Sequence, residues 1–223
     1  MDCEKVKPGR GAPLRKNNSE QLTITIEPVP LDEIYIINGP SLFHKNIKKS
    51  NLIILPEEFY MIINISKKNE LEIHYDKDIS NHQVIYDPYK YENEKKKPLR
   101  IEDIINQFKI PEGYIDVLPK WYSFKFTYPD FNLIFIKPKL GISFQIHDNR
   151  NERWQIVKGN PIIIIGNKVY YNVENEKEFE IPINTIHSVI NTNSEEYVVL
   201  KERWTGKFDE KDIYRIFNPN NYR

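Results

Sequence analysis

The stretch GISFQIHDNRNERWQIVKG, residues 141–159, decides the fold that we expect for this chain. Apolar and polar residues alternate through most of it, which is typical of a strand with one face in a core. Alternate side chains of a strand share a face, so positions 147 and 149 would point the same way. A His-x-His pair followed by a Glu can present three ligands to one cation. Here His147 and Glu152 are present, but Asn149 stands in the second histidine position.

Two motifs at fixed spacing resemble those of the cupin superfamily. The matching positions are Gly141, His147, Glu152 and Gly159 in the first motif, and Pro182, His187 and Asn191 in the second. The sequence departs from the family pattern at Asn149, and at Asn184, where the second motif has a glycine. The first motif also has one residue fewer before its Glu.

The resemblance is closer to one branch, the type II mannose-6-phosphate isomerase domain, which also forms the C-terminal end of bifunctional mannose-1-phosphate guanylyltransferases. It covers roughly residues 117–223. The positions in register with that branch are Ser143, Gln145, His147, Arg150, Glu152, Trp154, Val157, Gly159, Glu202, Gly206, Asp212, Ile213 and Arg215. So many matches at fixed spacing identify the family.

The resemblance implies an all-β fold, the double-stranded β-helix or jelly-roll barrel of the cupins. It also implies that His147, Glu152 and His187 hold a divalent metal such as Zn, Co, Mn or Mg, with Asn149 at most a weak fourth ligand. The alternative is that the two histidines are satisfied interior residues inherited from an ancestor. A carboxylate facing a barrel interior is costly without a cation or an Arg partner, so Glu152 favours the metal site.

The implied activity is that of a metal-dependent isomerase converting an aldose 6-phosphate, such as mannose 6-phosphate, into its ketose through a cis-enediol. Arg150 is the candidate for binding the sugar phosphate, because its guanidinium suits a phosphate. Glu202 is a candidate catalytic base from its matched position alone. Whether the chain is an enzyme stays open. It could instead be a catalytically degenerate bicupin with a structural or binding role, self-associating as a homodimer, and a metal oxygenase is a weaker third option.

The rest of the chain suggests a second, degenerate copy. We expect a flexible basic arm over residues 1–20, a degenerate cupin-like β domain over 21–98, and the cupin domain over 99–223. NLIILPEEFYMIINISKKNELEIHY in the first half resembles EFEIPINTIHSVINTNSEEYVVLKE in the second, which indicates two copies of one β unit. The segment IEDIINQF, residues 101–108, has the apolar spacing of a helix.

Composition limits the partners. The 32 basic and 32 acidic residues cancel, which argues against nucleic acid as a partner. No apolar run approaches the roughly 20 residues of a membrane span, and the N-terminus lacks the apolar core of a secretion signal. The single cysteine, Cys3, fits a reducing compartment. We therefore expect a cytoplasmic protein that binds no membrane, and the family resemblance implies a small sugar phosphate as its ligand.

Overall fold

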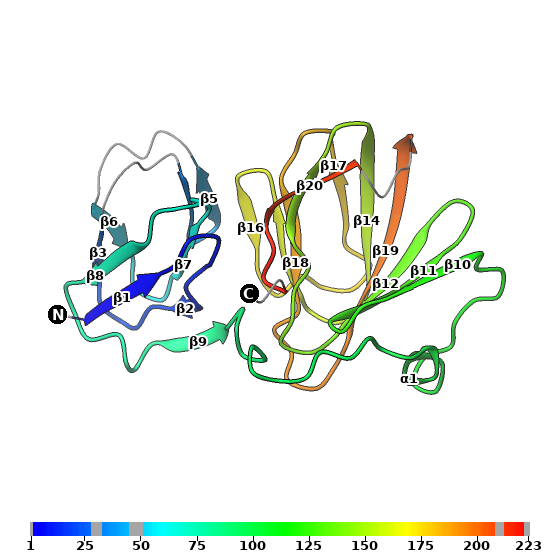
Figure 1. Ribbon diagram of the computed structural model, residues 1–223, viewed down its shortest axis with the longest axis horizontal. Coiled ribbons are helices and arrows are strands. Elements are labelled where there is room, and N and C mark those ends of the chain that lie inside the picture. The colour runs from blue at the N-terminus through cyan, green and yellow to red at the C-terminus, as the bar shows by residue number, and fades with distance from the viewer. Residues whose placement is uncertain (1, 28–32, 45–50, 208–211, 221–223) are drawn as a thin grey trace. The chain divides into compact units, whose positions relative to one another are not determined.

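The computed structural model, drawn in Figure 1, describes residues 2–27, 33–44, 51–207 and 212–220. As predicted, the fold is all-β: among the described residues the one α-helix is the short α1 (Ile101–Ile105), which lies inside the segment predicted to be helical. The chain divides into two compact units. Unit 1 is Met1–Pro88 with Gly166–Val169, and unit 2 is Tyr89–Ile165 with Tyr170–Arg223. The structure thus divides the chain at Pro88, whereas the sequence suggested a boundary near residue 98.

Unit 1 consists of two antiparallel sheets around one core. One sheet has the order β1-β8-β3-β6, and the other contains β5-β4-β7-β2-β9. The bounds are β1 (Asp2–Val6), β2 (Leu14–Lys16), β3 (Leu22–Glu27), β4 (Ile34–Asn38), β5 (Ser41–His44), β6 (Asn51–Ile54), β7 (Phe59–Asn64), β8 (Leu71–Tyr75) and β9 (Gln83–Tyr86). The core between them is mostly isoleucine, with Tyr60 and Tyr75.

The first twenty residues differ from the expected basic arm. Strands β1 and β2 both lie in this segment and pair with β8 and β7. Val6, Ala12 and Leu14 are buried. The charged residues of this segment made its strands hard to recognise in the sequence, because Lys5 lies on the exposed face of β1 while Val6 faces the core. With strands this short, one buried side chain in two is a weak apolar pattern.

Unit 2 has the same kind of construction. One sheet has the order β10-β11-β12-β19-β14-β17, and the other contains β15-β18-β13-β20. The bounds are β10 (Asp116–Pro119), β11 (Ser123–Thr127), β12 (Asn132–Ile136), β13 (Phe144–His147), β14 (Arg150–Lys158), β15 (Ile162–Ile165), β17 (Glu178–Ile181), β18 (His187–Ile190), β19 (Val198–Gly206) and β20 (Ile213–Phe217). Trp154, one of the positions matched to the family, lies fully buried in the cluster between the sheets. A second cluster, which includes Ile104 of α1, covers the outer face of β11, β12 and β19.

The remaining strand, β16 (Lys168–Tyr170), follows a turn at Gly166. Residues 166–169 belong to unit 1, where Lys168 pairs with Ser41 of β5. Backbone hydrogen bonds from Leu42 to Asn167 (2.9 Å) and from Val169 to Pro40 (2.8 Å) fix this pairing. A short segment from the second half of the sequence therefore completes unit 1.

The two units share one strand order. The run β1-β8-β3-β6 of unit 1 corresponds to β12-β19-β14-β17 of unit 2, and β4-β7-β2-β9 corresponds to β15-β18-β13-β20. The register agrees as well: Gly11 bridges Ile63 as Gly141 bridges Ile190. That the two units are copies of one cupin unit stays a prediction, and this correspondence supports it.

A buried asparagine ends the equivalent strands β7 and β18 in the same way. Asn64 donates to the carbonyls of Val6 (2.9 Å) and Asn69 (2.8 Å) and accepts from the amide of Ser66 (3.0 Å). Asn191 makes the same three contacts with Ile136 (3.0 Å), Glu196 (2.8 Å) and Asn193 (3.0 Å). Each asparagine thus ties the turn after its strand to a strand of the other sheet of its unit, β1 for Asn64 and β12 for Asn191.

None of the described helices is long and apolar enough to cross a membrane.

Candidate functional site

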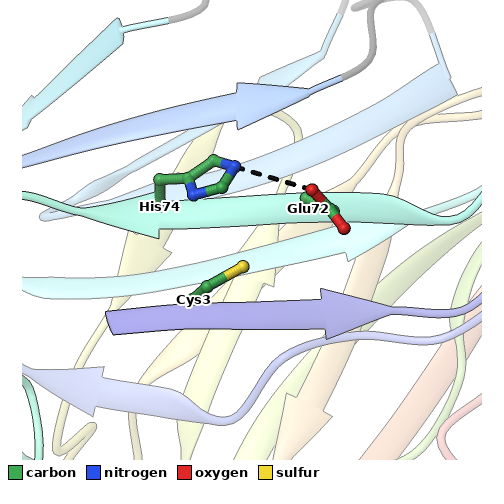
Figure 2. Close-up of side chains that lie close together, drawn as sticks. All are labelled: Cys3, Glu72 and His74. Carbon is green, nitrogen blue, oxygen red and sulfur yellow. Dashed lines mark ion pairs between the residues drawn. The ribbon is translucent and has the colours of Figure 1, made fainter. Parts of the chain in front are cut away.

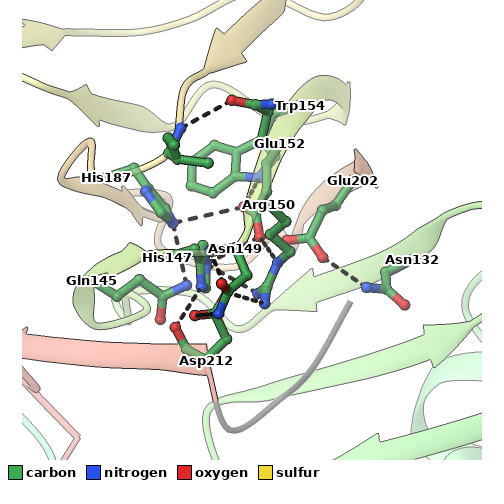
Figure 3. A network of polar contacts seen from close by, with 12 residues as sticks. Asn132, Gln145, His147, Asn149, Arg150, Glu152, Trp154, His187, Glu202 and Asp212 are labelled. Atoms are coloured by element: carbon green, nitrogen blue, oxygen red, sulfur yellow. Dashed lines mark hydrogen bonds and ion pairs between the residues drawn. The ribbon is translucent and has the colours of Figure 1, made fainter. Parts of the chain in front are cut away.

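Three buried side chains of unit 2 converge on one point (Figure 3). His147 ends β13, Glu152 lies near the start of β14, and His187 begins β18. Gln145 of β13 pairs directly with His187, and the backbone amide of Asn184 donates to the carbonyl of His147 (2.8 Å). The possible ligand atoms of His147, Glu152 and His187 lie within 4.8 Å of one another. The side chains are 2%, 1% and 1% exposed, so the sequence prediction that these residues meet agrees with the geometry.

Glu152 is the centre of this group. Its Oε1 lies 3.0 Å from Nε2 of His147 and accepts a hydrogen bond from Nε of Arg150 (2.9 Å). Its Oε2 accepts a hydrogen bond from the indole N–H of Trp154 (3.0 Å) and lies 3.7 Å from Nε2 of His187. Burial alone would raise the pKa of Glu152, but the hydrogen bond with His147 and the surrounding positive charge outweigh burial and hold the pKa well below its usual range. The carboxylate is therefore ionised at neutral pH.

His187 presents a lone pair to the group. Its Nδ1 lies 2.8 Å from the carbonyl of Thr185, which makes Nδ1 the donor and leaves Nε2 as an acceptor. Burial lowers the pKa of His187 to about 4, so the ring is neutral near pH 7. A neutral imidazole whose other nitrogen is held by a backbone carbonyl is the usual form of a metal-ligating histidine. His147 makes a weaker contact of the same kind, from Nδ1 to the carbonyl of Asp212 (3.4 Å), which likewise leaves its Nε2 facing the group.

The residues present fit a divalent ion. Two imidazoles and a carboxylate are the donors that Zn and related metals take. His147 Nε2 and Glu152 Oε1 are both acceptors when the ring is neutral, so their 3.0 Å approach requires a proton or a cation beside them. Two ligands about 2.1 Å from one ion lie about 3 to 3.5 Å apart, which agrees with this spacing.

Arg150 competes for the same two atoms. Its Nη2 lies 3.1 Å from Nε2 of His147, and its Nε donates to Oε1 of Glu152. The guanidinium is 3% exposed, and its Nη1 lies 3.7 Å from a carboxylate oxygen of Asp212. The protein therefore carries an internal cation that can satisfy Glu152 without a metal. The predicted role of Arg150 in phosphate binding stays a prediction.

Asn149 does not contact the three converging residues through its amide nitrogen. That nitrogen donates to Oδ1 of Asp212 (2.9 Å), and the backbone amides of Asp148 and Asn149 donate to the two oxygens of the same carboxylate (both 3.1 Å). Burial would raise the pKa of Asp212, but these hydrogen bonds lower it below its usual value. A role for Asn149 as a fourth ligand stays a prediction. Sequence reasoning matched Asp212 to the family pattern but missed this contact.

Glu202, on β19, is buried and has an unusual pKa. Asn132, its neighbour across the sheet, donates a hydrogen bond to its Oε1 (2.7 Å). Burial and the negative charge of Glu152 raise the pKa of Glu202 to about 8. A carboxyl group that titrates near neutral pH can both take and return a proton. The sequence placed Glu202 here only by its matched position.

A cleft of about 70 Å³ joins Glu202 and Arg150 to Arg215, which was matched to the family pattern, and to Lys120 and Lys125, which sequence analysis did not single out. Its lining residues are Leu118, Lys120, Tyr122, Ser123, Lys125, Ile134, Ile142, Ser143, Gln145, Arg150, Glu202, Ile213 and Arg215. Lysine and arginine side chains could recognise a phosphate at such a cleft. Isolated basic residues on strands carry no motif, and only the fold gathers them.

Among the residues that the structure describes, unit 1 has no group equivalent to His147, Glu152 and His187. Tyr60 pairs with Arg15 as His187 pairs with Gln145, so a tyrosine occupies the position of His187. Its hydroxyl contacts Nδ1 of His82 (2.8 Å) rather than a carboxylate. At this position the first copy therefore has a phenol in place of an imidazole.

A known protein family matches the second half of the chain. Residues 111–218 match the family described as mannose-6-phosphate isomerase C-terminal. A mannose-1-phosphate guanylyltransferase from Salmonella muenchen is 27% identical over 113 residues, which cover 49% of this chain and 24% of that protein. The alginate biosynthesis protein AlgA from Pseudomonas aeruginosa is 28% identical over 83 residues, 37% of this chain and 17% of that protein. The matches thus span about a quarter or less of the relatives' length.

Solved structures also resemble parts of the chain. A sugar phosphate isomerase of the cupin superfamily from Silicibacter pomeroyi aligns with a TM-score of 0.33 and 12% identity, over 39% of this chain and 60% of that one. A putative sugar phosphate isomerase from Acidithiobacillus ferrooxidans aligns with a TM-score of 0.36 and 15% identity, over 50% and 75%. The capsular polysaccharide assembling protein CapF from Staphylococcus aureus aligns with a TM-score of 0.38 and 21% identity, over 51% and 34%.

Proposed function

Because residues 111–218 belong to the mannose-6-phosphate isomerase C-terminal family of cupins, we propose that this chain interconverts an aldose 6-phosphate and its ketose. Mannose 6-phosphate and fructose 6-phosphate are the first pair to test. The observation that carries the proposal is a buried carboxyl of raised pKa, Glu202, beside the group formed by His147, Glu152 and His187. The reaction moves one proton from C2 to C1 and replaces the proton lost from the C2 hydroxyl by one gained at the C1 oxygen, so it is balanced and needs no external oxidant or reductant.

Glu202 is the proposed acid and base. In its ionised form it removes the proton from C2 of the aldose, and the C1 carbonyl oxygen gains a proton to give an enediol. The protonated Glu202 then returns its proton to C1, while the C2 hydroxyl loses its proton and becomes the carbonyl of the ketose. A group whose pKa lies near the working pH suits both steps.

His147, Glu152 and His187 would hold a divalent ion, which when bound would supply Lewis-acid stabilisation of the negative charge on the sugar oxygens. Zn, Co, Mn and Mg are the candidates. The neutral state of His187 and the ionised state of Glu152 support this, because ligands must be deprotonated. Burial of the three residues would keep water from the reacting carbons.

The phosphate would lie at the mouth of the cleft. The cleft encloses about 70 Å³, much less than the roughly 300–1,000 Å³ of most small-molecule sites, so only the reacting end of a sugar would lie inside. Lys125, Lys120 and Arg215 line the same cleft and supply the positive charge that a phosphate needs. Arg150 would position Glu152 and His147 as well as face the substrate.

Conversion of mannose 6-phosphate to fructose 6-phosphate tests the proposal, measured by a coupled assay after addition of Co, Mn, Zn or Mg. We expect turnover with at least one ion, and about a 100-fold or greater loss of kcat in Glu202→Gln. The matched control is Glu180→Gln, which removes an exposed carboxylate of unit 2 and should keep full activity. Folded, metal-loaded protein that gives no turnover would overturn the proposal for this sugar pair.

A second candidate is a catalytically degenerate bicupin with a structural or binding role, including self-association as a homodimer. Two observations favour it: the contacts of Arg150 with His147 and Glu152, and the use of the Asn149 amide by Asp212. In both cases a proposed metal ligand is already in contact with another side chain of the protein. Purified protein that contains no metal, binds none on addition and is inert with every ion would support this candidate. Sedimentation would then determine whether it forms a homodimer.

A further inference from the structure

A second group of metal-ligating side chains lies on an open sheet face of unit 1 (Figure 2). Cys3 of β1 pairs directly with His74 of β8, and Glu72 lies two residues before His74 on the same strand. Alternate residues of a strand share a face, so Glu72 and His74 point to the same side of the sheet. Ile73, which lies between them, and Tyr75, which follows, point to the core.

The ligand atoms of this group are close together. The sulfur of Cys3, a ring nitrogen of His74 and a carboxylate oxygen of Glu72 lie within 4.8 Å of one another. Nε2 of His74 is 3.7 Å from Oε2 of Glu72. Cys3 is exposed and the other two are partly exposed, so water could complete a coordination shell.

We propose that Cys3, Glu72 and His74 form a surface site for a thiophilic divalent ion such as Zn²⁺. A thiolate, an imidazole and a carboxylate are the ligand types that zinc takes, at bond lengths of about 2.0 to 2.3 Å. The strands fix two of the three Cα positions by direct pairing, so rotation of exposed side chains is enough to close the shell. Thiolate favours Zn²⁺ or Co²⁺ over Mg²⁺ or Ca²⁺.

Lys5 is the built-in competitor of the ion. It lies across from Glu72 on β1, with its Nζ 2.9 Å from one oxygen of Glu72 and 3.9 Å from Glu70. The hydrogen bond from Lys5 lowers the pKa of Glu72, so the carboxylate is ionised and available. Lys5 is itself 62% exposed and can swing into solvent when an ion takes the carboxylate. Its removal should therefore strengthen metal binding.

Sulfur makes this site separable from the site in unit 2. The chain has a single cysteine, so any bond between metal and thiolate must come from Cys3. The group of His147, Glu152 and His187 contains no sulfur. Cobalt(II) bound to thiolate gives an intense charge-transfer band in the near ultraviolet, whereas cobalt bound to nitrogen and oxygen does not. The band reports this site whether or not the isomerase proposal holds.

The experiment is titration of the full chain with Co²⁺ under a phosphine reductant, followed by competition with Zn²⁺. We expect a charge-transfer band that Zn²⁺ abolishes and that is absent in Cys3→Ser. His74→Gln should weaken apparent Co²⁺ affinity at least tenfold. His44→Gln, which removes a histidine of the same unit, is the matched control and should leave affinity unchanged. Lys5→Met should strengthen affinity several-fold.

Two results would overturn the proposal. One is wild-type protein, reduced and folded by circular dichroism, that gives no charge-transfer band at millimolar Co²⁺. The other is a band whose affinity is the same in wild type, His74→Gln and Lys5→Met, which would mean that the exposed thiol binds the ion alone. Cadmium-113 NMR of the wild type provides a second reading of sulfur ligation that needs no variant.

Discussion

Arg150 and a divalent ion would use the same atoms of the site. The guanidinium contacts Nε2 of His147 and Oε1 of Glu152, and it also lies beside Asp212. Removing one partner of a buried ion pair leaves the other charge uncompensated, at a cost of about 3–5 kcal/mol. Metal-free protein should therefore depend on Arg150 for stability, and metal-loaded protein should depend on it less.

Replacement of this residue tests the competition. In chelator, Arg150→Met should lower the free energy of unfolding by about 3–5 kcal/mol, because Glu152 loses its internal cation. Added Zn²⁺ should restore much of the loss and should bind more tightly than in wild type. Denaturant unfolding with and without Zn²⁺ measures both effects. Arg153→Met, on the exposed face of the same strand, is the control and should change stability little. Equal losses with and without metal would contradict the prediction.

Glu202 should make stability depend on pH in metal-free protein. Its folded pKa of about 8 lies above the ordinary value of 4.5, so the folded state binds the proton more tightly than the unfolded state does. The contribution is fully present below about pH 4.5 and is lost as pH rises to about 8. Glu202→Gln should therefore gain stability relative to wild type as pH rises through this window. Thermal unfolding in chelator at several pH values measures the difference, and a difference independent of pH would refute it.

At single positions the sequence predicted the residues with motif spacing and missed those without it. His147, Glu152 and His187 stand at cupin spacings, and the structure brings them together. The partner of Asn149 could not be predicted, because Asp212 lies 63 residues further along the chain. The raised pKa of Glu202 depends on burial and on the nearby charge of Glu152, and neither is a property of local sequence.

At the scale of elements, Asp212 holds the start of β20 against the turn between β13 and β14. Its carboxylate accepts backbone hydrogen bonds from Asp148 and Asn149, and β20 then pairs with β13. β20 lies at the edge of its part of the sheet in unit 2, so its attachment depends on β13 and on this carboxylate. The side chain therefore helps to hold β20 beside β13, the strand that carries His147.

Asp212→Asn should loosen β20 without unfolding unit 2. The amide that replaces the carboxylate keeps one acceptor oxygen, so at least one backbone amide loses a charge-assisted hydrogen bond. We expect faster hydrogen exchange at the amides of β20 and of Asp148 and Asn149, and unchanged exchange in β18. Asp116→Asn, at an exposed position, is the control. Uniform acceleration over the whole of unit 2 would contradict a local role.

Some elements show their type in the local sequence, but the first twenty residues do not. Strand β3, LTITIE, alternates directly, β14 alternates through most of its length, and the helix at Ile101 shows its apolar stripe. β1 and β2 have too few buried residues to give a period, and their charges hide them. Their place is fixed by pairing with β8 and β7, which lie far away in the sequence.

At the scale of the whole molecule, the shared strand order gives the two asparagines equivalent tasks. Asn64→Ala and Asn191→Ala each remove three hydrogen bonds from a fully buried position. Each should therefore lower the free energy of unfolding by about 2–5 kcal/mol. Denaturant unfolding measures the loss, and Asn69→Ala is the control because only its backbone accepts a bond from Asn64. A loss below about 1 kcal/mol in either variant would refute the equivalence.

The internal similarity was visible in the sequence because both halves keep an apolar strand that ends in Asn64 or Asn191. The division into units was harder to predict. The sequence suggested a boundary near residue 98. In the structure the first compact unit ends at Pro88 and also includes residues 166–169. No local signal marks such an exchange, since Gly166 and Asn167 are ordinary turn residues.

The assignment of residues 166–169 to unit 1 has a practical consequence for the design of truncated versions of the protein. A fragment starting at residue 89 would keep residues 166–169 but would lack β5, the strand with which they pair through Ser41. The backbone amides and carbonyls of this segment would form an unpaired strand edge, and such edges pair with strands of other molecules. Shortened versions should thus express as aggregates more readily than the intact polypeptide, and assays of the proposed isomerase activity are best carried out on the uncut chain.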